Sequence, residues 1–105
     1  MSDAPPMSDH DLIRALERQG GLLTERGLTL RAAEAQRAAG TLGQSAREHQ
    51  TAVDEGFRCQ RRAESPEALP ADATAAGLAQ TAIQLRSANL SSCREHAHRV
   101  LSRHR

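Results

Sequence analysis

Apolar side chains recur at helical spacing over the last third of the chain. Between Ala73 and Arg103 there is no proline and a single glycine, Gly77. Apolar and small residues at i, i+3, i+4 and i+7 predict one long amphipathic helix over residues 72–103, about 45 Å in length at 1.5 Å per residue. The stripe consists of Leu78, Ala82, Leu85, Asn89, Cys93, His96 and Val100. A face of this length needs cover from the rest of the chain or from a partner.

A second apolar pattern begins near the N-terminus. Residues 1–7 contain two prolines and show no periodicity, which predicts a disordered lead-in. Ser8 is a good N-cap for a helix over residues 9–39. Along that helix a leucine recurs every seven residues, which is typical of a coiled-coil seam. These leucines are Leu16, Leu23 and Leu30.

Two consecutive glycines interrupt this helix. In a helix interior the pair Gly20-Gly21 costs about 2 kcal/mol relative to alanine. Because the leucine repeat continues past the glycines, a kinked or interrupted helix is the favoured interpretation. Two short helices joined by a Gly-Gly turn are the alternative.

Turn signals divide the rest of the chain. Gly40 is suited to end the first helix, and Thr41 is suited to start a second helix over residues 41–64. The sequence S-P-E-A-L-P lies in a predicted connector over residues 65–71, after which Asp72 is expected to cap the last helix. A connector this short makes the flanking helices antiparallel neighbours.

No segment shows the pattern of a β-strand. Period-two alternation is absent, and β-branched and aromatic residues do not cluster. We therefore expect an all-α chain with a single helical domain over residues 8–105. The expected architecture is an elongated antiparallel helical hairpin or three-helix bundle with coiled-coil character.

The composition indicates a thin core. Leucine, isoleucine, valine and phenylalanine together supply 17 of the 105 residues, whereas alanine alone supplies 19. Alanine is the best helix former, but it buries little surface. Small chains with little core often gain stability from oligomerisation or from a partner. We therefore expect a homo-oligomer or a subunit of a larger complex.

The net charge of +1 is unevenly distributed. Residues 1–56 carry 6 arginines and 9 acids, a net charge of −3, and residues 57–105 carry 8 arginines and 4 acids, a net charge of +4. Antiparallel packing sets these halves side by side, which favours compaction or pairing with a second copy.

Two polar residues stand on otherwise apolar stripes and suggest a helix register. If the hairpin turns near Leu69 with equal rise along both helices, the numbers of facing residues sum to about 137, and His49 lies across from Asn89. A buried polar group needs a partner. We expect this pair to hydrogen-bond, directly or through water, and to set the register. Alternatively, both residues lie in water at the edge of the apolar face.

The same register separates the two cysteines. It places Cys59 near Leu78, and Cys93 about 22 Å farther along at 1.5 Å per residue. A disulfide requires Cα atoms within roughly 7 Å of each other. An intrachain Cys59–Cys93 disulfide is therefore incompatible with the predicted hairpin.

No motif points to catalysis, a cofactor or a metal. Cys93 and His96 can share a helix face, but His98 lies about 200° round the helix from His96, which leaves two ligands where structural zinc takes four. A cysteine nucleophile would need a base, an orienting group and a cleft, and a small hairpin offers no such cleft. Phosphate-loop, H-E-x-x-H and G-x-S-x-G motifs are absent. We expect a non-enzymatic protein.

Nucleic-acid binding is an alternative function. The C-terminal half is rich in arginine, with one cluster over residues 58–62 and another over residues 86–105. However, it has no aromatic stacking platform and no helix-turn-helix signature. Basic residues near a helix C-terminus also suit the helix dipole.

A protein–protein interaction role is the favoured function. We expect a small assembly, adaptor or chaperone-like subunit that docks through apolar helix faces. No run approaches the ~18 apolar residues of a membrane span, and no signal peptide is evident, so the cytoplasm is the expected compartment. The residues expected to make partner or oligomer contacts, or else to form internal core, are Leu16, Leu23, Leu30, Val53, Phe57, Leu78, Leu85, Leu90 and Leu101.

In size and predicted hairpin plan the chain resembles the WXG100 class of secreted helical hairpins. This resemblance implies a secreted helical hairpin as a second alternative. The chain has S-P-E-A-L-P where that class has a W-x-G turn, and it lacks the tyrosine-based export tail.

Overall fold

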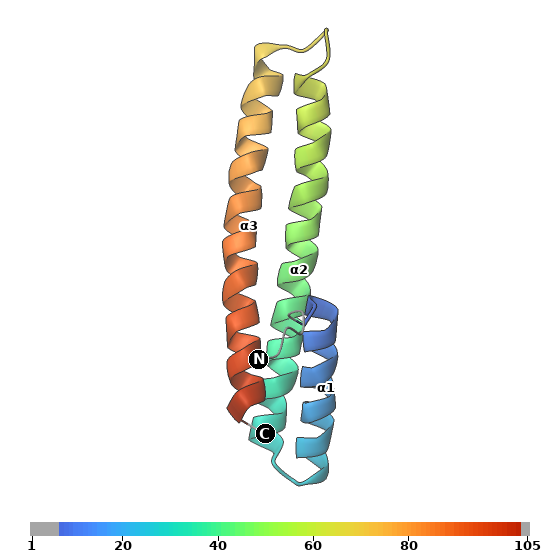
Figure 1. The fold of residues 1–105 in the computed structure, drawn as a ribbon, viewed down its shortest axis with the longest axis vertical. Coiled ribbons are helices and arrows are strands. Elements are labelled where there is room, and N and C mark those ends of the chain that lie inside the picture. The colour runs from blue at the N-terminus through green and yellow to red at the C-terminus, as the bar shows by residue number, and fades with distance from the viewer. Residues whose placement is uncertain (1–6, 104–105) are drawn as a thin grey trace, which may run out of the picture. The chain divides into compact units, whose positions relative to one another are not determined.

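The computed structural model describes residues 7–103, which form three α-helices and no strand (Figure 1). The helices are α1 (Asp9–Glu25), α2 (Thr29–Ala63) and α3 (Pro70–Arg103). The predicted all-α fold class is therefore confirmed over this range. The predicted lead-in over residues 1–7 lies outside the described residues, except for Met7.

The chain divides into two compact units. The first, here the three-helix unit, comprises Met1–Gln44 and Ser92–Arg105, and thus contains α1, the start of α2 and the end of α3. The second, here the two-helix unit, comprises Ser45–Ser91, and thus contains the end of α2, the connector and the start of α3. The bundle and the hairpin that the sequence predicts both occur, each in its own unit.

The first helix begins at the predicted cap. The Ser8 side-chain hydroxyl accepts a hydrogen bond from the Asp11 backbone N–H at 3.1 Å. Asp9 and Asp11 place negative charge in the first turn, where the helix dipole favours it. The prediction of Ser8 as the N-cap is confirmed.

The predicted helix over residues 9–39 is wrong, because the chain turns at Gly27. This residue has φ 77°, a conformation that glycine adopts without steric cost. The Leu28 N–H donates to the Leu23 carbonyl at 2.9 Å, and the Gly27 N–H donates to the Thr24 carbonyl at 3.0 Å. These two hydrogen bonds form a Schellman C-cap, which ends α1 two residues before the glycine.

The helix boundary predicted at Gly40 and Thr41 is also wrong. α2 continues through both residues. The buried residues Ala38, Ala39 and Leu42 lie on either side of the glycine. A continuous helix keeps all of them in the core, and this packing outweighs the weak local signals for a helix end.

Gly20 and Gly21 lie inside α1, so the alternative of a Gly-Gly turn is wrong. A Cβ added to Gly20 would stand 3.1 Å from Gln36 Cγ and 3.5 Å from the Ala32 carbonyl oxygen. The missing side chain therefore allows α1 to approach α2 closely. This packing offsets the poor helix propensity of glycine.

The connector spans residues 64–69, whereas residues 65–71 were predicted. Pro70 is the first residue of α3, a position where the missing N–H costs nothing. Asp72 lies in the first turn and not at the N-cap: its Oδ2 accepts a hydrogen bond from the Leu69 backbone N–H at 2.8 Å. Asp72 therefore acts as the acid that reaches back in a capping box.

Buried apolar side chains concentrate in the three-helix unit. Those in the described part of that unit are Leu12, Leu16, Leu23, Ala32, Ala35, Ala38, Ala39, Leu42, Ala97 and Val100. The two-helix unit buries Cys59 and Leu90, together with the hydroxyl residue Ser45. Two helices alone leave much of their surface in water, so this unit has little core of its own.

Candidate interaction surface

Polar contacts in the two-helix unit agree with the predicted register. The Asn89 side-chain amide donates to Ser45 Oγ at 3.0 Å. Arg86 Nη1 lies 3.6 Å from Glu48 Oε2. Both pairs join α2 to α3 close to the levels that an antiparallel hairpin turning near Leu69 requires.

Asn89 has a different partner from the predicted His49. Its hydrogen bond goes to Ser45, which lies one helical turn before His49 on α2 and is 3% exposed. A buried hydroxyl needs a partner more than a half-buried imidazole that still reaches water. That Asn89 sets the register stays a prediction, now with Ser45 as the second residue.

Three of the predicted contact residues belong to the internal core. Leu16 and Leu23 are buried in the three-helix unit, and Leu90 is buried in the two-helix unit. Val53 and Leu101 are half-buried.

The remaining predicted contact residues are exposed. They are Leu30 (87%), Phe57 (65%), Leu78 (68%) and Leu85 (67%). Leu30 lies in water because the turn at Gly27 breaks the seven-residue leucine repeat before it reaches α2. Leu69 is also exposed, although the turn signals around it predict only a connector and no contact residue.

Phe57 and the two exposed leucines of α3 lie on different sides of the two-helix unit. Gly56 faces α3, since a Cβ there would stand 2.6 Å from Ile83 Cδ1. At 100° per residue, Phe57 lies about 100° round α2 from Gly56, and Leu78 and Leu85 lie about 140–160° round α3 from Ile83. The leucines therefore project from the edge of α3 that points away from α2.

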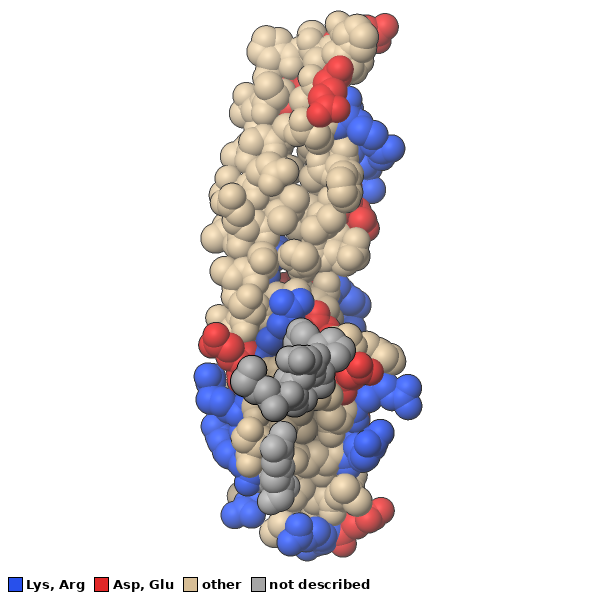
Figure 2. Space-filling view, viewed as in Figure 1, with Lys and Arg blue, Asp and Glu red and all other residues tan. Residues whose placement is uncertain are grey.

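The α3 portion of this unit contains a stretch without formal charge. Residues 73–85, here the uncharged segment, include no Asp, Glu, Lys or Arg. In Figure 2 uncharged residues form most of the surface over this part of α3, while charged side chains are visible along α2. Most of the segment is exposed, and its half-buried members are Ala76, Ala79 and Ile83. A long exposed helix face without charge is unusual for a surface in contact with water alone.

Glu55 on α2 forms hydrogen bonds and ion pairs with neighbouring residues of the same helix. Arg58 donates from Nη2 at 2.7 Å and from Nε at 3.1 Å, and the Cys59 thiol donates at 3.5 Å. The hydrogen bond from Arg58, followed by that from Cys59, lowers the pKa of the Glu55 carboxyl. The same hydrogen bond raises the pKa of Arg58. Arg62 lies 3.6 Å from Glu55 and completes a surface ion-pair network.

Several arginines of the basic C-terminal half are ion-paired with acids. In the three-helix unit Arg94 binds both carboxylate oxygens of Asp9 at 2.6 and 2.9 Å, a hydrogen bond that raises the pKa of Arg94. Arg103 donates to Glu34 at 3.0 Å. Such pairs reduce the positive charge that the chain can offer to an anionic partner. The paired arginines in this half are Arg58, Arg62, Arg86, Arg94 and Arg103.

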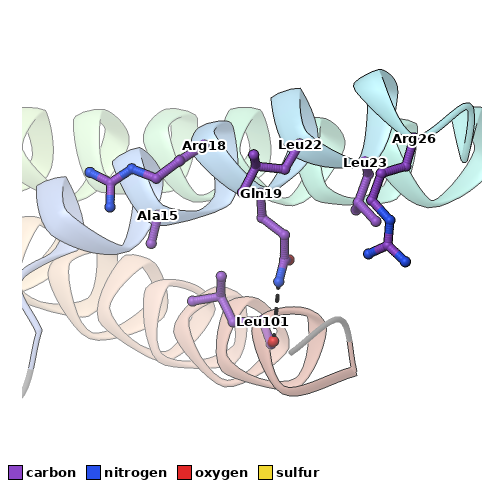
Figure 3. Close-up of a pocket in the computed structure, with 7 residues that line it drawn as sticks. All are labelled: Ala15, Arg18, Gln19, Leu22, Leu23, Arg26 and Leu101. Atoms are coloured by element: carbon purple, nitrogen blue, oxygen red, sulfur yellow. Dashed lines mark hydrogen bonds between the residues drawn. The ribbon is translucent and has the colours of Figure 1, made fainter.

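A shallow cavity of about 220 Å³ lies in the three-helix unit (Figure 3). Across it the Gln19 side-chain amide donates to the Leu101 carbonyl at 3.3 Å. Its volume is below the ~300 Å³ at which small-molecule sites usually begin. Its lining consists of Ala15, Arg18, Gln19, Leu22, Leu23, Arg26 and Leu101.

An open depression of about 450 Å³ borders Phe57. Asp54, Arg58 and Arg61 line it beside the aromatic ring. An exposed aromatic side chain next to arginine is a combination that protein interfaces use at their energetic centres.

The residues considered for metal binding do not gather into a site. Cys93 and His96 are half-buried and His98 is exposed. Over residues 7–103 no group of three or more histidine, cysteine and acidic side chains is placed to hold a metal ion. Both cysteines are free thiols. None of the helices described is sufficiently long and apolar to traverse a lipid bilayer.

In comparisons with known proteins, no family model, curated protein or solved structure matches this chain.

Proposed function

We propose that this chain is a non-enzymatic helical protein–protein interaction module and that the two-helix unit carries the interaction. The observation that supports this proposal is that Ser45–Ser91 exposes more large apolar side chains than it buries. The apolar residues there that are buried and not merely half-buried are Cys59 and Leu90, whereas Phe57, Leu69, Leu78 and Leu85 are exposed.

The magnitude of this difference favours a partner. Burying one large apolar side chain contributes about 1.5–3 kcal/mol. A single exposed leucine is common on soluble proteins. A unit with little core and several exposed large apolar side chains would gain stability if those side chains were buried. Docking of another helix would bury them.

The ion pairs of the arginines support protein binding over nucleic-acid binding. To contact Arg58, Arg86 or Arg94, a phosphate backbone would have to displace Glu55, Glu48 or Asp9. Phe57 is the one Phe, Tyr or Trp of the sequence, so the chain offers little of the aromatic surface on which single-stranded bases stack.

A pair of matched variants tests this function. Phe57→Glu adds a charge to the exposed aromatic position of the two-helix unit, and Leu30→Glu adds the same charge to an exposed leucine of the three-helix unit. Purified chains are used as bait in native lysate, bound proteins are quantified by mass spectrometry, and the mass of each bait in solution is measured.

We expect Phe57→Glu to reduce the recovery of a specific captured protein at least tenfold, while Leu30→Glu leaves it unchanged. Circular dichroism should show the same helix content in both variants. Equal recovery of captured proteins with both variants, in a chain that also stays monomeric, would contradict the proposal. A monomer that captures no protein and binds DNA with steep salt dependence would support the nucleic-acid alternative instead.

A further inference from the structure

We propose that the uncharged segment of α3 binds the same segment of a second copy of this chain, in antiparallel orientation. The two-fold axis lies between Thr81 and Ala82. This inference rests on the proposed interaction function and names the partner and the surface.

The exposed edge of α3 is suited to contact with another helix. Its outward-facing residues recur at spacings of three and four, and all are exposed. Two are leucines seven residues apart, and the others are small, so a second helix can approach closely between the leucines. Within the uncharged segment these residues are Thr74, Ala75, Leu78, Thr81, Ala82 and Leu85.

The polar groups of this edge already have partners. Thr74 Oγ1 donates to the Pro70 carbonyl at 3.4 Å, and Thr81 Oγ1 donates to the Gly77 carbonyl at 3.3 Å. Each threonine therefore presents its methyl group while its hydroxyl is bonded to its own helix. Covering this edge would leave neither hydroxyl donor without an acceptor, so burial carries little of the usual polar cost.

The absence of charge determines which partner fits. The uncharged segment holds no acid or base that could pair with a charged partner, and burying an unpaired charge is costly. The partner surface must therefore be uncharged as well. A second copy supplies such a surface with the same spacing, and Leu78 of one chain then meets Leu85 of the other at both ends of the two-fold contact.

The antiparallel orientation follows from the ends of the helix. A parallel pair would place the two N-termini of α3 side by side, each with Asp72 in its first turn. An antiparallel pair separates these like charges and opposes the two helix dipoles.

The size of the contact sets its strength. A segment of 13 residues is about 20 Å long, and one helix edge of that length covers a few hundred Å², less than the ~800 Å² per partner of a standard interface. We therefore expect a dimer whose population depends on protein concentration.

Sedimentation equilibrium over a wide concentration range tests the contact. The mass of the full chain should rise from 11.3 kDa towards twice that value as concentration increases. Leu78→Glu and Leu85→Glu should each weaken dimerisation at least tenfold. The matched control is Ser87→Glu, an exposed position about 200° round α3 from Leu85, which should leave the dimer unchanged. Both leucines are exposed, so helix content should not change.

Disulfide crosslinking tests the orientation. In a Cys59→Ala/Cys93→Ser background with unchanged helix content, Ala82→Cys should crosslink with itself, because it lies beside the two-fold axis. Leu78→Cys should crosslink with Leu85→Cys in a mixture of the two variants. It should not crosslink with itself, because the two copies of residue 78 lie about 10 Å apart along the pair at 1.5 Å per residue. Self-crosslinking of Leu78→Cys would indicate a parallel pair and overturn the antiparallel arrangement.

The outcomes separate this inference from the proposed function. A chain that stays monomeric but captures another protein through Phe57 overturns the second-copy proposal and leaves the interaction function intact. A dimer lost with Ser87→Glu and kept with Leu78→Glu also overturns it, because the contact then lies elsewhere. A chain that neither dimerises nor captures a protein overturns both.

Discussion

Ser45 is the buried polar residue that joins the two helices of the two-helix unit. Its hydroxyl accepts the Asn89 amide at 3.0 Å, while Asn89 itself is exposed. The two ends of this hydrogen bond therefore differ: one is shielded from water and the other reaches it. Losing the partner of a buried group costs its full desolvation, whereas an exposed group exchanges its partner for water.

Substitution of each residue should reveal this asymmetry. Asn89→Ala leaves the Ser45 hydroxyl buried without its donor and should lower the free energy of unfolding by about 1–2 kcal/mol. Ser45→Ala leaves an amide that water can satisfy and should cost less, roughly 0.5 kcal/mol or below. Urea unfolding of the two variants measures both values. Equal losses would mean that water already reaches Ser45.

Helix ends and helix interiors place opposite demands on glycine. Gly27 ends α1 in the left-handed region with φ 77°, whereas Gly21 lies in the interior of the same helix. In neither case would an added Cβ meet an atom within 4 Å. The two residues therefore differ in backbone conformation and not in available space.

Alanine at these positions should have effects of opposite sign. Gly21→Ala should stabilise the chain by about 0.5–1 kcal/mol, because alanine is the better residue in a helix interior. Gly27→Ala should destabilise it by about 1–2 kcal/mol, because an L-residue is strained in the left-handed region. Thermal unfolding monitored by circular dichroism compares them. A stabilising Gly27→Ala would show that α1 does not end in the Schellman motif.

The three-helix and two-helix units differ in how much apolar surface they bury. The first contains the fully buried Leu12, Leu16, Leu42 and Val100. None of the largest fully buried side chains of the described chain belongs to the second. Local opening requires less free energy where fewer apolar contacts are lost.

Native-state hydrogen exchange should therefore distinguish the units. Under conditions where the chain is monomeric, backbone amides of α2 between Ala32 and Leu42 should exchange at least tenfold more slowly than those between Val53 and Arg62. Helix hydrogen bonds are present in both stretches, so propensity does not explain the difference. Uniform protection along α2 would contradict the predicted difference between the units. Increased protection of α3 over residues 73–85 on dimerisation would be expected from the proposed contact.

Local signals in the sequence were sufficient to predict the helical class, the Ser8 cap, the connector after α2 and the level at which α2 faces α3. These features depend on residues close together in the chain: a hydroxyl three residues before an N–H, prolines in a short segment, and helical spacing of small and apolar residues. The register followed because a short connector leaves antiparallel helices little freedom.

Other features were decided by tertiary packing. Gly20, Gly27 and Gly40 are the same residue type, and only their surroundings determine their different roles. Gly20 packs against α2, Gly27 ends α1, and Gly40 lies inside α2. The leucine pattern likewise could not separate core from surface.

Leu16 and Leu78 stand on equally regular stripes, yet one is buried and the other is 68% exposed. Periodicity indicates which side of a helix is apolar, but burial depends on how many helices pack against that side. The sequence by itself determined that this chain forms helices with sparse apolar faces. The tertiary structure decided that three helices gather in one unit and two in the other, which is why the exposed apolar side chains Phe57, Leu78 and Leu85 belong to the second.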